Sequence, residues 1–112
     1  MSNISRQYIH KALAPIKPLR FLKGYYQVVI ILYLCIDDWD FHNDLGDIYL
    51  EVSQLCHCNP DSIERNIRTM LLSIDFRVLS AMVGYEIEAI PTVKDFIDIL
   101  VTYITRDYIN TI

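Results

Sequence analysis

Glycine and proline are scarce in this sequence, with three glycines and four prolines among 112 residues. Long flexible linkers need these residues, so none is expected, and no low-complexity run or internal repeat interrupts the chain. The length suits one domain with a core of its own. Because 53% of the residues are apolar, a disordered tail is excluded as well. We therefore expect a single domain over residues 1–112.

A long apolar run is also missing. The most apolar stretch, residues 25–36, covers about a dozen residues and contains Gln27, whereas a membrane-spanning helix needs roughly 18 or more. Asp37, Asp38 and Asp40 follow at once, so the stretch cannot be extended. We interpret it as a buried core helix and expect no membrane partner.

Cysteine is sparse and odd in number, at positions 35, 56 and 58. A secreted disulfide scaffold would have an even and denser set, so we expect reduced thiols in a cytoplasmic protein. The tripeptide Cys56-His57-Cys58 has the composition of a metal-binding motif. A structural zinc site takes four ligands, however, usually from two separate pairs, and the sequence has no second pair.

Catalytic signatures are missing too. The sequence has no G-x-S-x-G, no H-E-x-x-H and no glycine-rich phosphate loop, and its three histidines are scattered. The acidic run from Asp40 through His42 and Asp44 to Glu51 approaches a calcium-binding loop, yet Leu45 occupies the position that requires glycine. We expect no enzyme activity and no cofactor, and we interpret the run as a solvated acidic connector.

Positive charge is in deficit, since the formal net charge is −4. This average argues against a generic nucleic-acid binder, but it conceals a strong segregation along the chain. Residues 1–30 contain five basic residues and no acid, residues 31–60 six acids and no base, residues 61–80 three of each sign, and residues 81–112 two bases and five acids. The five basic residues of the first segment are Arg6, Lys11, Lys17, Arg20 and Lys23. The average is therefore compatible with a small basic footprint.

The spacing of apolar residues predicts an all-α fold, a compact bundle of about six helices. The expected helices cover residues 5–14, 18–36, 44–56, 60–74, 76–83 and the segment from Thr92 onward. Their end signals are Ser5 and Asn59 as caps, Pro18 and Pro60 in first turns, Gly84 after a helix, and Thr92 with Asp95 as a capping-box pattern. The β-branched run at 28–31 also suits a strand, but it lacks a partner. In the connector at 37–43, we expect Trp39 and Phe41 to anchor in the core.

Three of these helices carry an apolar stripe that we expect to be buried. The stripe of helix 44–56 is Ile48, Val52 and Leu55. The stripe of helix 60–74 is Ile63, Ile67, Met70, Leu71 and Ile74. The stripe of the last helix is Ile97, Val101, Ile104 and Tyr108. The second stripe is the clearest and leaves the opposite face of its helix polar.

Helices 44–56 and 60–74, joined by a tight turn, have the plan of a helix-turn-helix, in which the second helix enters the DNA major groove. The polar face of the second helix carries Ser62, Glu64, Arg65, Arg68 and Thr69. Arginine can donate two hydrogen bonds to guanine or pair with phosphate, and a glutamate can accept from cytosine. The same face also suits ordinary i,i+4 ion pairs, Asp61–Arg65 and Glu64–Arg68.

The segment YLEVSQLCHCNPDSIERNIR, residues 49–68, resembles the helix-turn-helix of one bacterial family. The family comprises the C-terminal DNA-binding domains of stage zero sporulation protein A, the sporulation response regulator of endospore-forming bacteria. Its pattern is Tyr-Pro-x-Ile-Ala, eight variable residues, then Arg-Val-Glu-Arg-Ala-Ile-Arg-His. The matching residues here are Tyr49, Val52, Ile63, Glu64, Arg65, Ile67 and Arg68. Outer landmarks are Ile9-His10 with Pro15, Gly84-Tyr85, Pro91-Thr92 and Phe96-Ile97.

The resemblance implies a six-helix domain that binds DNA sequence-specifically as a pair, through the face holding Glu64, Arg65 and Arg68. The departures are that Ser62 replaces the first arginine of the motif, Thr69 replaces its histidine, and His57, Cys58 and Asn59 replace the polar turn. Of this turn, Asn59 and His57 keep polar groups that could contact the DNA backbone. The receiver domain of the family is missing, so we expect a freestanding effector domain.

Two hypotheses follow. In the first, the chain is a DNA-binding transcription regulator connected with sporulation, whose Arg65 and Arg68 contact double-stranded DNA while Lys11, Lys17, Arg20 and Lys23 add affinity for its backbone. In the second, a degenerate helix-turn-helix serves as a protein-interaction or dimerisation module that does not bind DNA. The net charge, Ser62, and an apolar last helix that ends at Ile109 and Ile112 favour the second, since an exposed apolar stripe marks a partner or homodimer surface.

Overall fold

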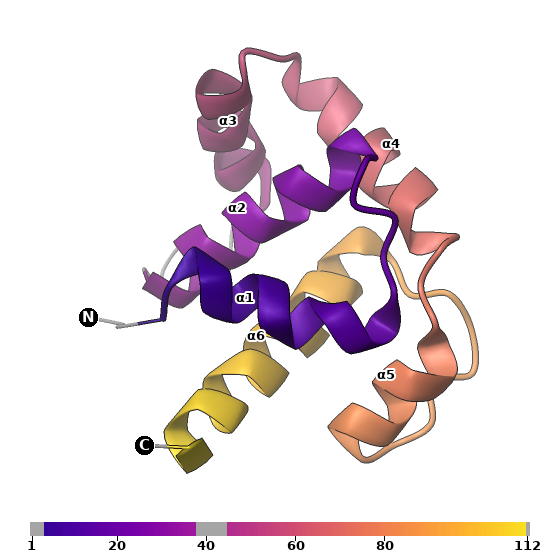
Figure 1. The fold of residues 1–112 in the computed structure, drawn as a ribbon. Helices are drawn as coiled ribbons and strands as arrows, with labels where there is room; N and C mark the ends of the chain where they lie inside the picture. Colours follow the sequence, from indigo (N-terminus) through magenta and orange to yellow (C-terminus); the bar gives the residue numbers. More distant parts are fainter. Residues whose placement is uncertain (1–3, 38–44, 112) are drawn as a thin grey trace.

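Helices make up the fold in the computed structural model of the protein, which describes residues 4–37 and 45–111 (Figure 1). Within these ranges there are six α-helices, one 3-10 turn and no strand. The elements are α1 (Arg6–Leu13), η1 (Ala14–Ile16), α2 (Lys23–Asp37), α3 (Leu45–Cys56), α4 (Pro60–Leu71), α5 (Phe76–Val83) and α6 (Val93–Thr111). The predicted all-α class is confirmed, and the strand alternative at 28–31 is wrong. Predictions for Trp39, Phe41 and Asp44, and for the Asp40 end of the acidic run, lie outside the described residues.

The predicted helix ends are confirmed wherever a local cap defines them. Ser5 Oγ accepts the Tyr8 N–H at 3.1 Å at the start of α1, and Thr92 Oγ1 accepts the Asp95 N–H at 3.1 Å at the start of α6. Gly84 ends α5 in the left-handed conformation, with φ of 85°, which glycine adopts without steric cost.

Two helix ends differ from the prediction, and a hydrogen bond to a residue far along the chain lies next to each. Helix α2 begins at Lys23 rather than Pro18; Lys17 has a positive φ of 55°, and the Leu19 N–H is bonded to Ser73 Oγ at 3.4 Å in the segment that precedes the helix. Helix α4 ends at Leu71 rather than at residue 74. The N–H groups of residues 72–74 bond three residues back, and the next N–H, at 75, donates to the Ile16 carbonyl at 2.9 Å. These bonds tighten the chain into a turn that tethers it to η1.

Helix α2 forms the centre of the molecule and contacts α1, α3, α4 and α6 (Figure 1). Its fully buried side chains come from several sides of the helix: Tyr25, Val28, Val29, Ile31, Leu32 and Cys35. A helix surrounded in this way is apolar all round, which explains the most apolar stretch of the sequence without a membrane. Across residues 4–37 and 45–111, no helix combines the length and the hydropathy that crossing a bilayer demands.

The predicted burial of the apolar stripes is confirmed except at Leu55. All five stripe residues of the segment at 60–74 are buried, as are Ile97, Val101 and Ile104 in α6. Tyr108 is half-buried. In α3, Ile48 and Val52 are buried, whereas Leu55 is 52% exposed. The partly buried Cys56 packs against the core instead, so the stripe of α3 proceeds in steps of four residues rather than four and then three.

Helix α4 is held against the N-terminal end of α2 by a close backbone approach at Gly24. A Cβ atom placed on this glycine would lie 2.3 Å from the carbonyl oxygen of Asn66 and 3.1 Å from Cα of Ile67. Only a residue without a side chain fits at this position. The contact fixes the depth at which α4 sits on α2, and therefore the height of the polar face of α4 above the core.

Candidate nucleic-acid interface

The turn between α3 and α4 spans residues 57–59 and has a defined geometry. His57 adopts a left-handed conformation with φ of 53°, and the Cys58 N–H donates to the Ser53 carbonyl at 3.0 Å. A left-handed residue followed by this backbone bond is the Schellman arrangement that ends many helices, with histidine here in place of the usual glycine. Asn59 then caps α4, and its Oδ1 accepts the Asp61 N–H at 2.9 Å. The predicted roles of Asn59 as cap and of Pro60 as first helical residue are confirmed.

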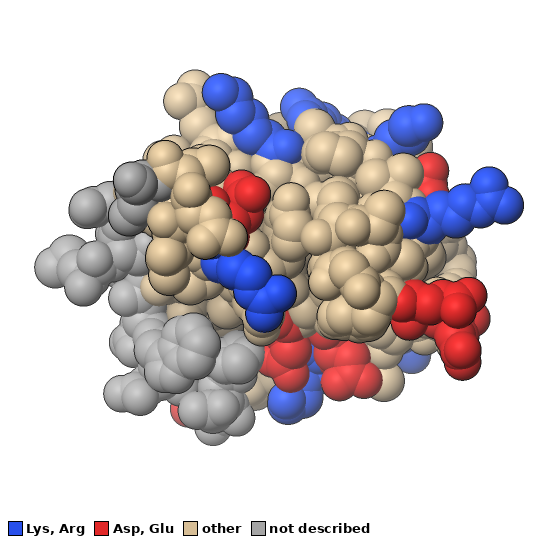
Figure 2. All heavy atoms as spheres, turned by 90° about the horizontal axis from the view of Figure 1, so that it is seen from below, with Lys and Arg blue, Asp and Glu red and all other residues tan. Residues whose placement is uncertain are grey.

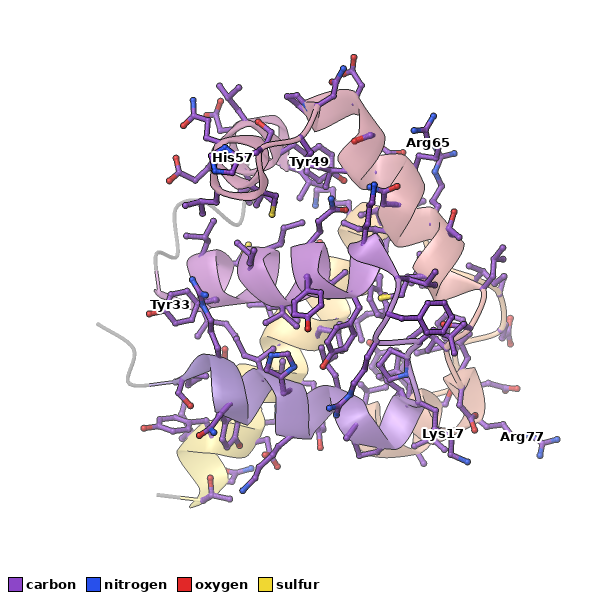
Figure 3. The ribbon with its side chains drawn as sticks, turned by 45° about the horizontal axis from the view of Figure 1, so that its top comes forward. Lys17, Tyr33, Tyr49, His57, Arg65 and Arg77 are labelled. Atoms are coloured by element: carbon purple, nitrogen blue, oxygen red, sulfur yellow. The ribbon has the colours of Figure 1, made fainter. Side chains whose placement is uncertain are left out.

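The side of α4 opposite its buried stripe faces solvent and carries four exposed charged residues. Arg68 Nη2 lies 3.7 Å from Glu64 Oε1, with both side chains at least half exposed, so this predicted ion pair is present but loose. The other predicted pair, Asp61–Arg65, is not among the ion pairs formed by the described residues. Figure 3 shows Arg65 projecting away from α4 into solvent. Arg65 is therefore available to an external acceptor.

The two predicted hydroxyl residues are turned toward their own helix. Ser62 Oγ donates to the Asn59 carbonyl at 2.8 Å, and Thr69 Oγ1 donates to the Arg65 carbonyl at 3.1 Å. Each hydroxyl proton is thus already used, and only the oxygen lone pairs remain for an external donor. The six predicted site residues lie on the solvent side of the turn and α4. The short Ser62 side chain is directed back toward its own helix and does not extend from this surface.

The basic residues of the first segment do not gather around this face. Lys23 lies beside the α3–α4 turn, in a hollow of about 310 Å³ that it lines with His57 and Cys58. Lys11 lines a different hollow, together with Asp107 of α6. The Arg20 guanidinium lies over the Tyr25 ring, 5.7 Å from its centroid. Of the four basic residues expected to add affinity for DNA, only Lys23 is placed next to the turn by these contacts.

The charged residues that Figure 2 and Figure 3 show are scattered in the same way. Figure 3 places Lys17 and Arg77 at the opposite end of the view from Arg65. Figure 2, seen from below, shows Lys and Arg side chains separated by uncharged surface, with Asp and Glu side chains among them. The exposed face of α4 is itself formally neutral, because Asp61 and Glu64 balance Arg65 and Arg68.

A groove that the sequence did not predict adjoins the two arginines. It has a volume of about 640 Å³ and lies between α4 and the segment that leads into α6. Its lining consists of Arg65, Arg68, Thr69, Leu71, Leu72, Ile90, Pro91 and Thr92. Leu72 is 74% exposed and Ile90 is 56% exposed. Position 72 lies off the buried stripe of α4, and this is the one signal in the sequence that could have revealed an apolar edge beside the arginines.

Tyr49 lies between α3 and α4, beneath the charged face (Figure 3). Its hydroxyl is buried and has no hydrogen-bond partner among the described residues. Burial, together with the nearby Glu64 carboxylate, raises the pKa of Tyr49 to about 12, while Arg68 acts in the opposite direction. The Tyr49 hydroxyl is therefore neutral at physiological pH and couples electrostatically to the Glu64–Arg68 pair.

Comparisons of the chain with protein-family models, with curated proteins and with solved structures find no significant match. The resemblance to the sporulation effector domains thus remains a hypothesis based on the sequence landmarks. A functional proposal depends on the geometry of α4 and its turn.

The two cysteines of the Cys-His-Cys tripeptide lie on either side of the turn residue His57. Cys56 and Cys58 are free thiols, and burial raises the pKa of the Cys56 thiol. Across the part of the chain that the structure describes, no group of three or more His, Cys, Asp or Glu side chains is placed to hold a metal ion. The Cys-His-Cys tripeptide instead contributes to packing, since the Cys58 sulfur accepts a weak hydrogen bond from the buried Gln27 side chain at 3.8 Å.

Proposed function

We propose that this protein is a DNA-binding transcription regulator that inserts α4 into the major groove of double-stranded DNA. The observation that carries the proposal is the outward-facing Arg65, without an acidic partner among the described residues, on a helix that is capped and follows a three-residue turn. The landmark residues shared with the sporulation effector domains support the same function. A link to sporulation depends on that resemblance alone.

The chemistry of the face defines distinct roles. Arg65 and Arg68 are the candidates for bidentate hydrogen bonds to guanine, for which Arg68 must leave Glu64. An exposed ion pair contributes only about 0–1 kcal/mol, so this exchange is easy. Lys23 and Asn59, beside the turn, are the candidates for contacts to phosphate oxygens. Glu64 is then available to accept from cytosine.

The balanced charges of α4 predict weak non-specific binding. With three cations near the face, Lys23, Arg65 and Arg68, the logarithm of the binding constant should fall against the logarithm of the salt concentration with a slope no steeper than about −3 per chain. Affinity should instead depend on sequence, because contacts to bases must supply what the phosphate contacts do not.

Selection from a random duplex library, at low and at moderate salt, tests the proposal. Arg65→Gln with Arg68→Gln should abolish the selected sequence preference and weaken binding at least about tenfold. A matched control removes the same charge at the far end of the molecule, with Lys17→Asn and Arg77→Gln; asparagine tolerates the left-handed backbone of position 17. Absence of binding at low salt, or equal losses in the two double variants, would contradict the proposal.

A second function, a protein-interaction module, is favoured by one specific observation. The groove beside Arg65 exposes Leu72 and Ile90, and exposed apolar side chains in a groove suit a protein partner better than a phosphate backbone. In this case Leu72→Ser with Ile90→Ser abolishes partner binding, whereas Arg65→Gln with Arg68→Gln affects it less. The duplex selection separates the two functions, because a protein module without DNA affinity yields no enriched sequence.

A further inference from the structure

The outward side of α6 forms a second surface, separate from α4. Thr102 and Arg106 are exposed there, and Ile109 is 61% exposed although it is apolar. Two adjoining hollows share Thr102 and Arg106. The first, of about 200 Å³, is completed by Val83, Tyr85, Asp98, Ile99 and Tyr103, and the second, of about 310 Å³, by Thr105, Ile109 and Asn110. The surface is continuous from Asp98 to Asn110 and follows the axis of one helix.

The charges on this surface are arranged symmetrically about Thr102. Asp98 lies four residues before Thr102 and Arg106 four residues after it, so all three share one face of α6. At 1.5 Å per residue, the acid and the base lie about 6 Å on either side of the threonine along the helix axis. If the helix is reversed about Thr102, Asp98 is placed where Arg106 was and Arg106 where Asp98 was. This pair of charges is therefore its own complement.

We propose that this α6 face binds a second copy of the chain, in an antiparallel two-fold pair centred on Thr102. Asp98 of each copy then faces Arg106 of the other, which gives two equivalent ion pairs. A contact of this kind closes on itself and stops at the dimer. Parallel packing in the same register would oppose Asp98 to Asp98 and Arg106 to Arg106, so the charges select the antiparallel arrangement.

The remaining side chains fit the same arrangement. The Asp98 carboxylate is bonded to Lys94 Nζ at 3.1 Å, and because a carboxylate accepts several hydrogen bonds, it can bind Lys94 and the Arg106 of the second copy together. Reversal about Thr102 also places Ile99 opposite Thr105.

A charge-swap experiment tests this register, with oligomeric state measured by analytical ultracentrifugation from micromolar to millimolar concentration in the absence of DNA. We expect the native chain to dimerise. Arg106→Asp and Asp98→Arg should each weaken self-association at least about tenfold, because each variant opposes like charges. An equimolar mixture of the two variants should restore a heterodimer, since every acid then faces a base.

Control variants distinguish loss of this contact from a general effect of charge and from unfolding. Arg77→Asp makes the same change of charge on α5, off this surface, and should leave the dimer intact. Circular dichroism melts check that each variant is folded, and Thr102→Arg, a change at an exposed position, serves as an independent variant that opposes two cations on the axis. A native chain that stays monomeric, an Arg106→Asp chain that still dimerises, or a mixture that fails to associate would each overturn the proposal. Because DNA is absent, failure here leaves the proposed DNA binding unaffected.

Discussion

Replacement of Gly24 by alanine is the sharpest test of how the fold positions α4. The added Cβ would lie 2.3 Å from the Asn66 carbonyl oxygen and 2.7 Å from its carbonyl carbon. Both atoms belong to the backbone of α4, so no side-chain rotation relieves the clash. Ordinary contacts of this kind begin at 3.4 Å, so α4 would have to withdraw from α2 by about 1 Å.

The expected cost follows from two opposing terms. Overpacking of a core costs about 1–3 kcal/mol, and the higher helix propensity of alanine offsets at most about 1 kcal/mol of it. The net cost is about 0–2 kcal/mol with the full offset and about 1–3 kcal/mol without it, so we expect Gly24→Ala to lower the free energy of unfolding by about 1–2 kcal/mol, where the two ranges overlap. In a domain of this size, such a loss corresponds to a fall in Tm of about 5–15 °C.

Thermal and urea unfolding, followed by circular dichroism, measure this difference. Gly46→Ala is a matched control, because Gly46 is exposed and is the second residue of α3, as Gly24 is the second residue of α2. The control should be neutral, or stabilising by up to about 1 kcal/mol, because alanine reduces the freedom of the unfolded chain. If Gly24→Ala were as stable as Gly46→Ala, the close approach of α2 and α4 would be wrong, and with it the height of the polar face of α4 above the core.

Two further predictions concern the turn and the residue beneath α4. Asn59→Ala removes the cap of α4 and should cost about 1 kcal/mol in urea unfolding, whereas Asn59→Asp, which keeps an acceptor, should cost less. Because the folded state raises the pKa of Tyr49 from 10.0 to about 12, it holds the phenol proton more tightly than the unfolded chain. The resulting stabilisation is complete below pH 10 and is lost as the pH rises through 12. Tyr49→Phe should flatten this alkaline loss in urea unfolding, and should not lower stability at neutral pH, because the hydroxyl that it removes is buried without a partner. An unchanged alkaline profile would show that other groups cause the loss.

The features that could be predicted from the sequence are those that neighbouring residues determine. The cap at Asn59, the start of α4 at Pro60 and the left-handed end at Gly84 each depend on a side chain and the backbone within a few residues of it. The buried stripe of α4 is equally local, since its period fixes one face, and the large apolar residues on that face must meet the core. These features together made the polar face of α4 predictable.

The features that could not be predicted depend on contacts between residues far apart in the chain. The segment before α2 is bonded through Leu19 to Ser73, a residue far along the chain, and no periodicity near Pro18 indicates this contact. Leu55 is exposed because the neighbours of α3 lie along its four-residue steps, which is a property of packing rather than of its own sequence. The groove beside Arg65 joins α4 to Ile90, some twenty residues further along the chain.

The basic residues show most clearly that side chains close together in the sequence need not lie close together on the surface. The first segment is uniformly basic in sequence, yet a 3-10 turn and two helices carry its side chains in different directions: Lys23 to the α3–α4 turn, Lys11 to the C-terminal half of α6, and Arg20 onto an aromatic ring. The segment that contains α4 is neutral in sequence, and the exposed face of α4 is formally neutral as well, because Asp61 and Glu64 balance Arg65 and Arg68. A protein built in this way has little long-range attraction for DNA, so any affinity must come from the few groups that reach the bases. In the proposed antiparallel dimer, Asp98 and Arg106 of α6 would pair two chains and so double the number of these contacts without adding a basic patch.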